Sequence, residues 1–383
     1  MNVFFSFVIA FVLALTLTPL FRSLAHRLGV LSYPNERSVH KKPIPYFGGI
    51  AIYISSVVAI LAIGPQDKST QQGIIWGGLI ILIVGILDDL YSLKPWQKVL
   101  GQLASAICVV ALGVDITFIK DPFTGMFRFL GILAVPVTIM WVICFENVIN
   151  LSDGLDGLAA GLSGIAALVT VFASTKAGLP AVSLAAAAVA GSVFGFLPYN
   201  FHPASIFMGD AGAMYLGLVL SVISVQGLVK STIVLSVLGP ILALLVPISD
   251  AAFAIVRRRA SGKPVSSADH DHIHHRLLDL GLDHRQAVLA IYLVSGVFGV
   301  LGLSSTFLPV KSSTTIAGLA VVGLFIVAQK IGILSVPGSK RKGKGSCAEL
   351  KSGRGQSAAS ANKQSPSKSV ASPDVLGVKS PRK

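Results

Sequence analysis

Long apolar stretches separated by short polar segments run along almost the whole chain. A helix needs about 20 apolar residues to cross a hydrocarbon core of about 30 Å, and several stretches approach that length. The pattern predicts an all-α polytopic membrane protein with about 11 transmembrane helices (10–11). The expected helices cover residues 3–21, 47–63, 73–87, 99–114, 129–145, 157–174, 181–198, 211–229, 232–256, 287–306 and 313–330.

The composition excludes a water-soluble protein. Of the 383 residues, 53% are hydrophobic and only 13% are charged, whereas soluble domains carry about 25% charged residues. The three cysteines are too few and too scattered for a disulfide framework. We therefore expect one transmembrane domain over residues 1–336.

Residues 337–383 differ from the rest of the chain. They contain 11 Lys/Arg and two acidic residues, much Ser, Gly and Pro, and no aromatic residue, which is typical of a disordered segment. Such a basic tail can bind nucleic acid, but on a membrane protein a position near anionic lipid is the simpler interpretation. We expect a disordered cytoplasmic tail that has no nucleic-acid partner and is dispensable for the chemistry.

The basic residues predict the orientation in the membrane. Arg22 and Arg27 follow the first apolar stretch and no basic residue precedes it, which predicts an uncleaved anchor with its N-terminus outside. In that orientation the cytoplasmic loops contain 13 Lys/Arg and the opposite loops contain six. The positive-inside rule supports this arrangement.

Carboxylates gather at the cytoplasmic ends of the expected helices. Asp88 and Asp89 close the third span, and Asp153, Asp156 and Asp210 lie beside later spans. Adjacent acids repel each other, so a pair persists where a divalent cation or a proton relieves the repulsion, with ordinary solvation at a helix end as the alternative. A transporter would place such groups near the bilayer midplane. The pattern favours a membrane enzyme with its active-site loops at the cytoplasmic face.

The loop between the fifth and sixth spans is the richest in polar groups. Asn150, Asp153 and Asp156 occur there together with two glycines. Asp and Asn oxygens suit Mg²⁺, which commonly shares its coordination with substrate phosphates. The alternative is a turn stabilised by Asx side chains, with a helix cap.

Two further loops carry candidate binding groups. Phe207 and Asp210 stand in a Phe-Met-Gly-Asp run that opens the eighth span. A carboxylate there binds a cation or caps the helix, and the ring stacks on a nucleobase or anchors the chain at the interface. Lys42 precedes a Pro-x-Pro-x-x-Gly-Gly segment, residues 43–49, whose prolines and glycines hold the backbone rigid.

Five of the eight histidines lie between positions 270 and 284. The densest run, residues 269–276, reads Asp-His-Asp-His-Ile-His-His-Arg. A Zn²⁺ site is one interpretation of this run. Binding of phosphate and sugar hydroxyls is a second, and a solvated loop is a third.

Together and in this order, these segments resemble the polyprenyl-phosphate N-acetylhexosamine-1-phosphate transferases of glycosyltransferase family 4. The resemblance covers about residues 1–330 and implies a multi-helix bundle, a cytoplasmic active site and dependence on Mg²⁺ or Mn²⁺. The matching motifs imply catalytic roles for Asp88, Asp89, Asp156, His272, His274 and His275, substrate-binding roles for Lys42, Asn150, Phe207 and Arg276, and metal-binding roles for Asp153 and Asp210.

The last loop resembles the His-x-His-His-Arg form of the WecA/TagO-like branch, whereas the related MraY enzymes show three consecutive histidines. This implies transfer of GlcNAc 1-phosphate from a UDP-N-acetylhexosamine to undecaprenyl phosphate, with release of UMP. The reaction would be the first membrane step of cell-wall polysaccharide, teichoic acid or O-antigen synthesis in a bacterial inner membrane. The alternatives are a UDP-MurNAc-pentapeptide donor, as in peptidoglycan synthesis, or a transporter of nucleotide-sugars or lipid-linked sugars. A homodimer is compatible with the resemblance.

Overall fold

The computed structural model describes residues 1–34, 42–64, 67–120, 126–230, 241–260, 272–304, 308 and 310–331. The chain divides into two units, Met1–Pro337 and Gly338–Lys383, and all described residues belong to the first. The expected basic tail, the first part of the expected span 232–256, and residues 269–271 of the histidine-rich run lie outside the described residues. The prediction for the tail stays a prediction.

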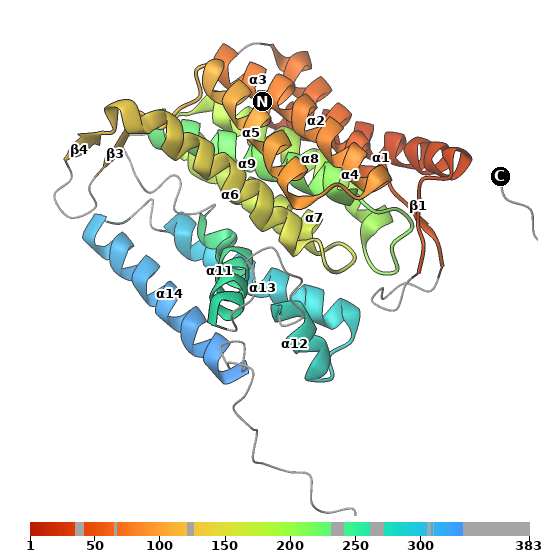
Figure 1. The fold of residues 1–383 in the computed structure, drawn as a ribbon. Helices are drawn as coiled ribbons and strands as arrows, with labels where there is room; N and C mark the ends of the chain where they lie inside the picture. The colour runs from red at the N-terminus through yellow and green to blue at the C-terminus, as the bar shows by residue number, and fades with distance from the viewer. Residues whose placement is uncertain are drawn as a thin grey trace, which may run out of the picture. The chain divides into compact units, whose positions relative to one another are not determined.

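The described part of the chain is a bundle of α-helices (Figure 1). The helices are α1 (Asn2–Leu28), α2 (Gly48–Ile63), α3 (Lys68–Gln72), α4 (Gly78–Tyr91), α5 (Pro95–Ala111), α6 (Ala134–Ser152), α7 (Leu158–Lys176), α8 (Pro180–Asn200), α9 (Gly209–Lys230), α11 (Leu245–Ala260), α12 (Ile273–Asp279), α13 (His284–Ser304) and α14 (Val310–Ile331).

Seven helical segments within the described ranges are long and apolar enough to cross a bilayer. They include α1, α7, α8 and α13, the run from α3 to α4, and most of α9. The prediction of an all-α polytopic membrane protein is confirmed by these segments, whereas the number of spans, 10–11, stays a prediction. Helix α2 is apolar too, but it is shorter.

Three short local features were not expected from the sequence. Strands β1 (Leu31–Ser32) and β2 (Ile44–Pro45) pair antiparallel, as do β3 (Phe118–Lys120) and β4 (Phe127–Phe129). A π-helical turn, Gly73–Gly77, joins α3 to α4. Segments of two to five residues are too short for a hydrophobic period to reveal them.

Helix α9 lies at the centre of the bundle and packs against α2, α4, α6, α7 and α8. Within its apolar stretch, Gly209–Gly227, 94% of the residues are buried. Helix α8 packs against α1 and α7, largely through small side chains that include the buried alanines 185–188. Lipid chains are as apolar as leucine, so small residues favour helix association in a membrane because they let the backbones approach closely.

The helix directions bring the polar helix ends together. The C-terminal ends of α4 and α8, the loop between α6 and α7, and the N-terminal ends of α5 and α9 contribute residues to one cavity. Successive spans that run in opposite directions therefore collect at one end of the bundle the carboxylates that are dispersed in the sequence.

Gly49, in the first turn of α2, sets how closely α2 approaches α9. A Cβ atom at Gly49 would lie 2.3 Å from the backbone nitrogen of Gly212. That distance is well inside van der Waals contact, so the two helices would have to move apart. On the same stretch the N–H groups of Gly48 and Gly49 donate to the carbonyls of Phe207 and Met208, each at 3.0 Å. The two glycines thus hold α2 against the segment that begins α9.

We predict that Gly49→Ala destabilises the protein by about 1–3 kcal/mol, because the methyl group forces α2 and α9 apart. Gly296→Ala in α13 is the matched control, because a Cβ atom at Gly296 meets nothing within 4 Å. The control should be neutral or stabilising by up to about 1 kcal/mol, since alanine favours the helix. Thermal unfolding of the two variants in detergent checks this. Equal melting temperatures would show that close approach at Gly49 is not required.

Candidate active site

A cavity of about 560 Å³ lies where these helix ends meet. Its wall is mainly polar and combines carboxylates, one lysine, imidazoles and two aromatic rings. The residues that line it are Tyr46, Asp88, Asp89, Ser92, Leu93, Lys98, Asp153, Gly154, Leu155, Asp156, Asn200, Phe207, Gly209, Asp210, His274, His275 and His284.

Asp210, in the first turn of α9, holds a central place in this cavity. Its Oδ2 accepts a hydrogen bond from the ammonium of Lys98 at 2.7 Å, and its Oδ1 accepts one from the Asn150 side chain at 2.7 Å. Lys98 at the start of α5 also forms an ion pair with Asp88. One ammonium therefore balances two carboxylates that come from different helices.

Asp89 binds the N-terminus of α9. Its Oδ1 accepts the backbone N–H of Asp210 at 2.9 Å, and its Oδ2 accepts that of Ala211 at 3.3 Å. A carboxylate at a helix N-terminus is stabilised by the unpaired N–H groups and the helix dipole. Gly209 permits this approach, because its φ is +69° and a Cβ atom there would lie 2.3 Å from Asp89 Oδ2. Asp89 thereby positions the backbone that carries Asp210.

Asp88 is buried beside Asp89 but faces different groups. Its Oδ1 accepts the backbone N–H of Leu93 at 2.8 Å, just beyond the end of α4. Its Oδ2 contacts Lys98. The adjacent pair predicted from the sequence thus separates in the structure. Asp89 binds the backbone of α9, whereas Asp88 faces the lysine and the cavity.

Asp153 and Asp156 lie in the loop between α6 and α7. Burial raises the pKa of Asp153 to about 7, and the negative charges of Asp210 and Asp156 add to the rise. Asp156 Oδ2 accepts the backbone N–H of Ala204 at 3.1 Å and lies 2.8 Å from His202 Nδ1. Asp153 thus faces an excess of negative charge, which a bound cation would relieve.

The oxygen donors in the cavity fit Mg²⁺ or Mn²⁺. Asp88, Asp153 and Asp210 supply carboxylates, and Asn150 supplies an amide next to Asp210. Hard cations prefer such oxygen ligands and keep several waters. Burial first, and then the charges of Asp210 and Asp156, raise the pKa of Asp153, so a cation bound there would favour its ionised form. Asp210 and Asp153 are the residues that would hold the ion.

Two aromatic rings form another part of the wall. Phe207 and Tyr46 lie with ring centroids 6.2 Å apart and planes tilted by 50°. The backbone N–H of Phe207 donates to the carbonyl of Pro45 at 2.9 Å. The Pro-x-Pro-x-x-Gly-Gly segment therefore positions the Phe-Met-Gly-Asp segment, which explains why both patterns occur in one chain.

The histidine-rich loop is anchored by Asp250 of α11. Asp250 Oδ2 lies 2.9 Å from His272 Nδ1, and Asp250 Oδ1 accepts the N–H of Ile273 at 3.0 Å. His274 reaches the cavity and packs on Gly154, where a Cβ atom would lie 2.6 Å from the imidazole. Burial, with the nearby His275, lowers the pKa of His274 to about 3. His274 is therefore a neutral hydrogen-bonding group at physiological pH.

The structure brings most of the predicted site residues together, and their chemical roles stay predictions. Asp88, Asp89, Asp153, Asp156, Phe207, Asp210, His274 and His275 line the cavity, and Asn150 contacts it through Asp210. Lys42, His272 and Arg276 do not line it. Lys42 is exposed, His272 is buried against Asp250, and Arg276 is half-buried.

Several cavity residues were not among the predicted site residues. Lys98 is one of the 13 basic residues of the expected cytoplasmic loops, and in the structure it contacts two site carboxylates. Tyr46, Asn200 and His284 also line the wall. Only Lys98 carried a usable signal, because it lies close behind the acidic pair at the start of a helix.

We predict that stability without divalent cations falls as the pH rises through about 7. A carboxyl whose pKa is raised by folding stabilises the protein while it is protonated, and this contribution is lost on deprotonation. Asp153 has such a raised pKa, so Asp153→Asn should reduce the drop in melting temperature between about pH 5.5 and 8 by about 2 °C or more. Thermal unfolding in EDTA checks this, with exposed Asp279→Asn as the control. An unchanged pH dependence in Asp153→Asn would contradict the prediction.

Comparison with known proteins identifies the family. Residues 72–228 match the family model described as Glycosyl transferase family 4. A Bacillus subtilis protein named "Probable undecaprenyl-phosphate N-acetylglucosaminyl 1-phosphate transferase" is 39% identical over 330 residues, covering 86% of this chain and 92% of the relative. A Mycolicibacterium smegmatis "Decaprenyl-phosphate N-acetylglucosaminephosphotransferase" is 35% identical over 341 residues, covering 80% and 82%.

A more distant relative carries a different name. A "Phospho-N-acetylmuramoyl-pentapeptide-transferase" of Desulforudis audaxviator is 30% identical over 328 residues, covering 77% of this chain and 96% of the relative. All three relatives thus match along most of their length. The ordered motifs, the cavity that they form and these similarities agree, and the chain belongs to glycosyl transferase family 4.

Proposed function

We propose that the protein transfers GlcNAc 1-phosphate from UDP-GlcNAc to undecaprenyl phosphate, releasing UMP. The reaction would depend on Mg²⁺ or Mn²⁺ and take place at the cytoplasmic face of a bacterial inner membrane. The observation that carries the proposal is the single cavity that joins carboxylates, Lys98 and two aromatic rings at one end of a membrane-spanning bundle. The names of the relatives that are 39% and 35% identical support the sugar and the polyprenyl acceptor.

The position of the cavity suits one water-soluble and one lipid substrate. It lies at the helix ends, so a nucleotide-sugar can enter from water while a lipid phosphate reaches it from the bilayer. Phe207 and Tyr46 offer ring faces for a nucleobase, since stacking on an aromatic residue is worth about 1–3 kcal/mol per base. A transporter is not supported, because the chain belongs to a transferase family.

The chemistry requires two negatively charged phosphates to meet. An oxygen of the lipid phosphate attacks the β-phosphorus of UDP-GlcNAc, and the bond from that phosphorus to the bridging oxygen breaks, so the electron pair leaves with UMP. A Mg²⁺ ion held by Asp210 and Asp153 would supply charge neutralisation at the diphosphate. Lys98 adds a fixed positive charge at the same place.

The structure favours different tasks for the remaining groups. Asp88 faces the cavity and is held by the N–H of Leu93, so it is placed to orient the lipid phosphate or to accept its proton. Asp89 positions α9 through two backbone hydrogen bonds. His274, being neutral, would hydrogen-bond to the sugar or the phosphates without adding charge.

We predict that Asp210→Asn reduces turnover to below about a tenth of the wild-type rate, because an amide keeps the shape but loses the charge that a divalent cation requires. Asp279→Asn, an exposed carboxylate outside the cavity, should leave turnover unchanged. The measurement is UMP release by purified protein given UDP-GlcNAc, polyprenyl phosphate and Mg²⁺. Failure of the wild-type protein to release UMP would refute the proposed function. Turnover by Asp210→Asn above about a tenth of wild type would move Asp210 to a structural role.

We predict that UDP-GlcNAc is used and that UDP-MurNAc-pentapeptide is not. The His-x-His-His-Arg loop and the lower identity to the pentapeptide-transferase, 30% against 39%, support the smaller donor. A radiolabelled-sugar transfer assay with each donor decides this. Efficient use of the pentapeptide donor would overturn the branch assignment while leaving the reaction class intact.

A further inference from the structure

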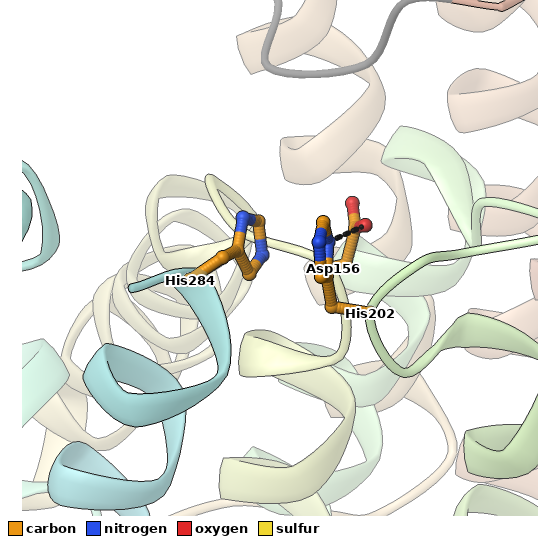
Figure 2. A group of neighbouring side chains, drawn as sticks. All are labelled: Asp156, His202 and His284. Carbon is orange, nitrogen blue, oxygen red and sulfur yellow. Dashed lines mark hydrogen bonds and ion pairs between the residues drawn. The ribbon is translucent and has the colours of Figure 1, made fainter. Parts of the chain in front are cut away.

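A second group of side chains that could hold a metal ion lies at the cavity, apart from the residues around Asp210. Asp156, His202 and His284 come from the α6–α7 loop, the α8–α9 loop and the first residue of α13, and their ligand atoms all lie within 4.8 Å of one another. Figure 2 shows the two imidazoles side by side, with a hydrogen bond between Asp156 and His202. Asp156 and His284 also face the cavity.

His284 is buried without a well-formed hydrogen bond. It is only 9% exposed, and its imidazole lies near the backbone of Asp156, but neither ring nitrogen makes a hydrogen bond of normal geometry among the described residues. Buried polar atoms of proteins nearly always have a partner, because leaving one without a hydrogen bond costs about 1–3 kcal/mol. The other two members of the group bring an imidazole and a carboxylate within reach of these nitrogens. An ion that binds imidazole nitrogen and carboxylate oxygen would bind all three side chains at once.

We propose that Asp156, His202 and His284 bind a transition-metal ion, with Zn²⁺ as the best fit. Two imidazoles and one carboxylate form a ligand set typical of Zn²⁺ sites that keep a fourth position open. Mg²⁺ does not fit, because it prefers oxygen ligands alone. The cavity thus has two kinds of metal site, one with oxygen donors around Asp210 and one with two nitrogen donors at His202 and His284.

To hold the ion, Asp156 and His202 must separate slightly and the His284 ring must turn, because stacked rings direct their nitrogen lone pairs along nearly parallel planes. Bonds of about 2.0–2.1 Å in a tetrahedral site place ligand atoms about 3.3 Å apart. Asp156 Oδ2 and His202 Nδ1 are already 2.8 Å apart. The ring centroids of His202 and His284 are 4.1 Å apart with planes inclined by 17°, so side-chain rotation of His284 is the main adjustment.

The ion would link the start of α13 to the α6–α7 and α8–α9 loops of the bundle. Two contacts already join these parts: Arg285 Nε donates to the carbonyl of His202 at 2.9 Å, and the Tyr292 hydroxyl donates to the carbonyl of Gly157. Helix α12, which carries His274 and His275, packs against α13. A metal at His284 would therefore stabilise the position of the histidine loop at the cavity.

Zinc content tests the proposal without either substrate, so the result is independent of the proposed transfer reaction. Protein carrying a tag without histidine is stripped with a chelator, dialysed against Zn²⁺ with excess Mg²⁺, and analysed by mass spectrometry for metals. We expect about one Zn²⁺ per chain that Mg²⁺ does not displace. Co²⁺ in place of Zn²⁺ should give the visible absorption of a tetrahedral site.

His284→Ala and His202→Ala should each weaken Zn²⁺ binding by more than about 100-fold, because loss of an outer-shell partner alone costs about 10–100-fold. His284→Gln is the second variant if His284→Ala does not fold, as judged by gel filtration. His26→Ala removes an exposed histidine and should keep the ion. Asp210→Asn should also keep it, because Asp210 belongs to the oxygen-rich site.

Three results would overturn the proposal. The first is a wild-type protein that binds no Zn²⁺ in the presence of Mg²⁺. The second is unchanged binding in His284→Ala or His284→Gln. The third is equal loss of Zn²⁺ in Asp210→Asn or His26→Ala, which would place the ion elsewhere.

Discussion

Repulsion between carboxylates at the end of an apolar bundle is the constraint on which the site depends. Asp88, Asp89, Asp153 and Asp210 line one cavity, and two such charges 4 Å apart repel by about 4 kcal/mol at an effective dielectric constant of 20. Each carboxylate has its own compensation. Asp89 accepts hydrogen bonds from two N–H groups of α9. Asp210 accepts hydrogen bonds from Lys98 and Asn150. Asp88 accepts one from the N–H of Leu93 and forms an ion pair with Lys98. Asp153 has a raised pKa instead.

These contacts require the helix ends to pack closely against one another. The bundle achieves this with small residues at close contacts, such as Gly85, where a Cβ atom would lie 2.3 Å from the Cα of Ala211. Gly49 makes a similar approach to Gly212 on the neighbouring face of α9. Helix α9 is therefore fixed from two sides in its first turn, which carries Asp210. The packing of the scaffold and the electrostatics of the site are controlled by the same few residues.

The cavity wall also separates its donor atoms by type. Oxygen donors surround the N-terminus of α9, whereas the imidazoles that line the wall come from α12 and α13. His272, predicted from the sequence to be catalytic, contacts Asp250 and does not line the cavity, and its role stays a prediction. Within the described residues, the zinc-type ligand set is Asp156, His202 and His284, only one of which belongs to the cluster between positions 270 and 284.

The sequence by itself determined the membrane class, the approximate positions of the long described helices and the five carboxylates that line the cavity. The length of an apolar stretch and the polarity of a loop are local properties. The motif segments around Asp88, Asp153 and Asp210 can likewise be recognised from one sequence. Tertiary structure decided what each group contacts. Lys98 and His284 line the cavity and Lys42 does not. A side chain reaches the cavity only if the packing of the chain around it directs it there. The helix directions and the close glycine contacts determine which side chains reach the cavity. Both depend on contacts between segments that are far apart in the sequence.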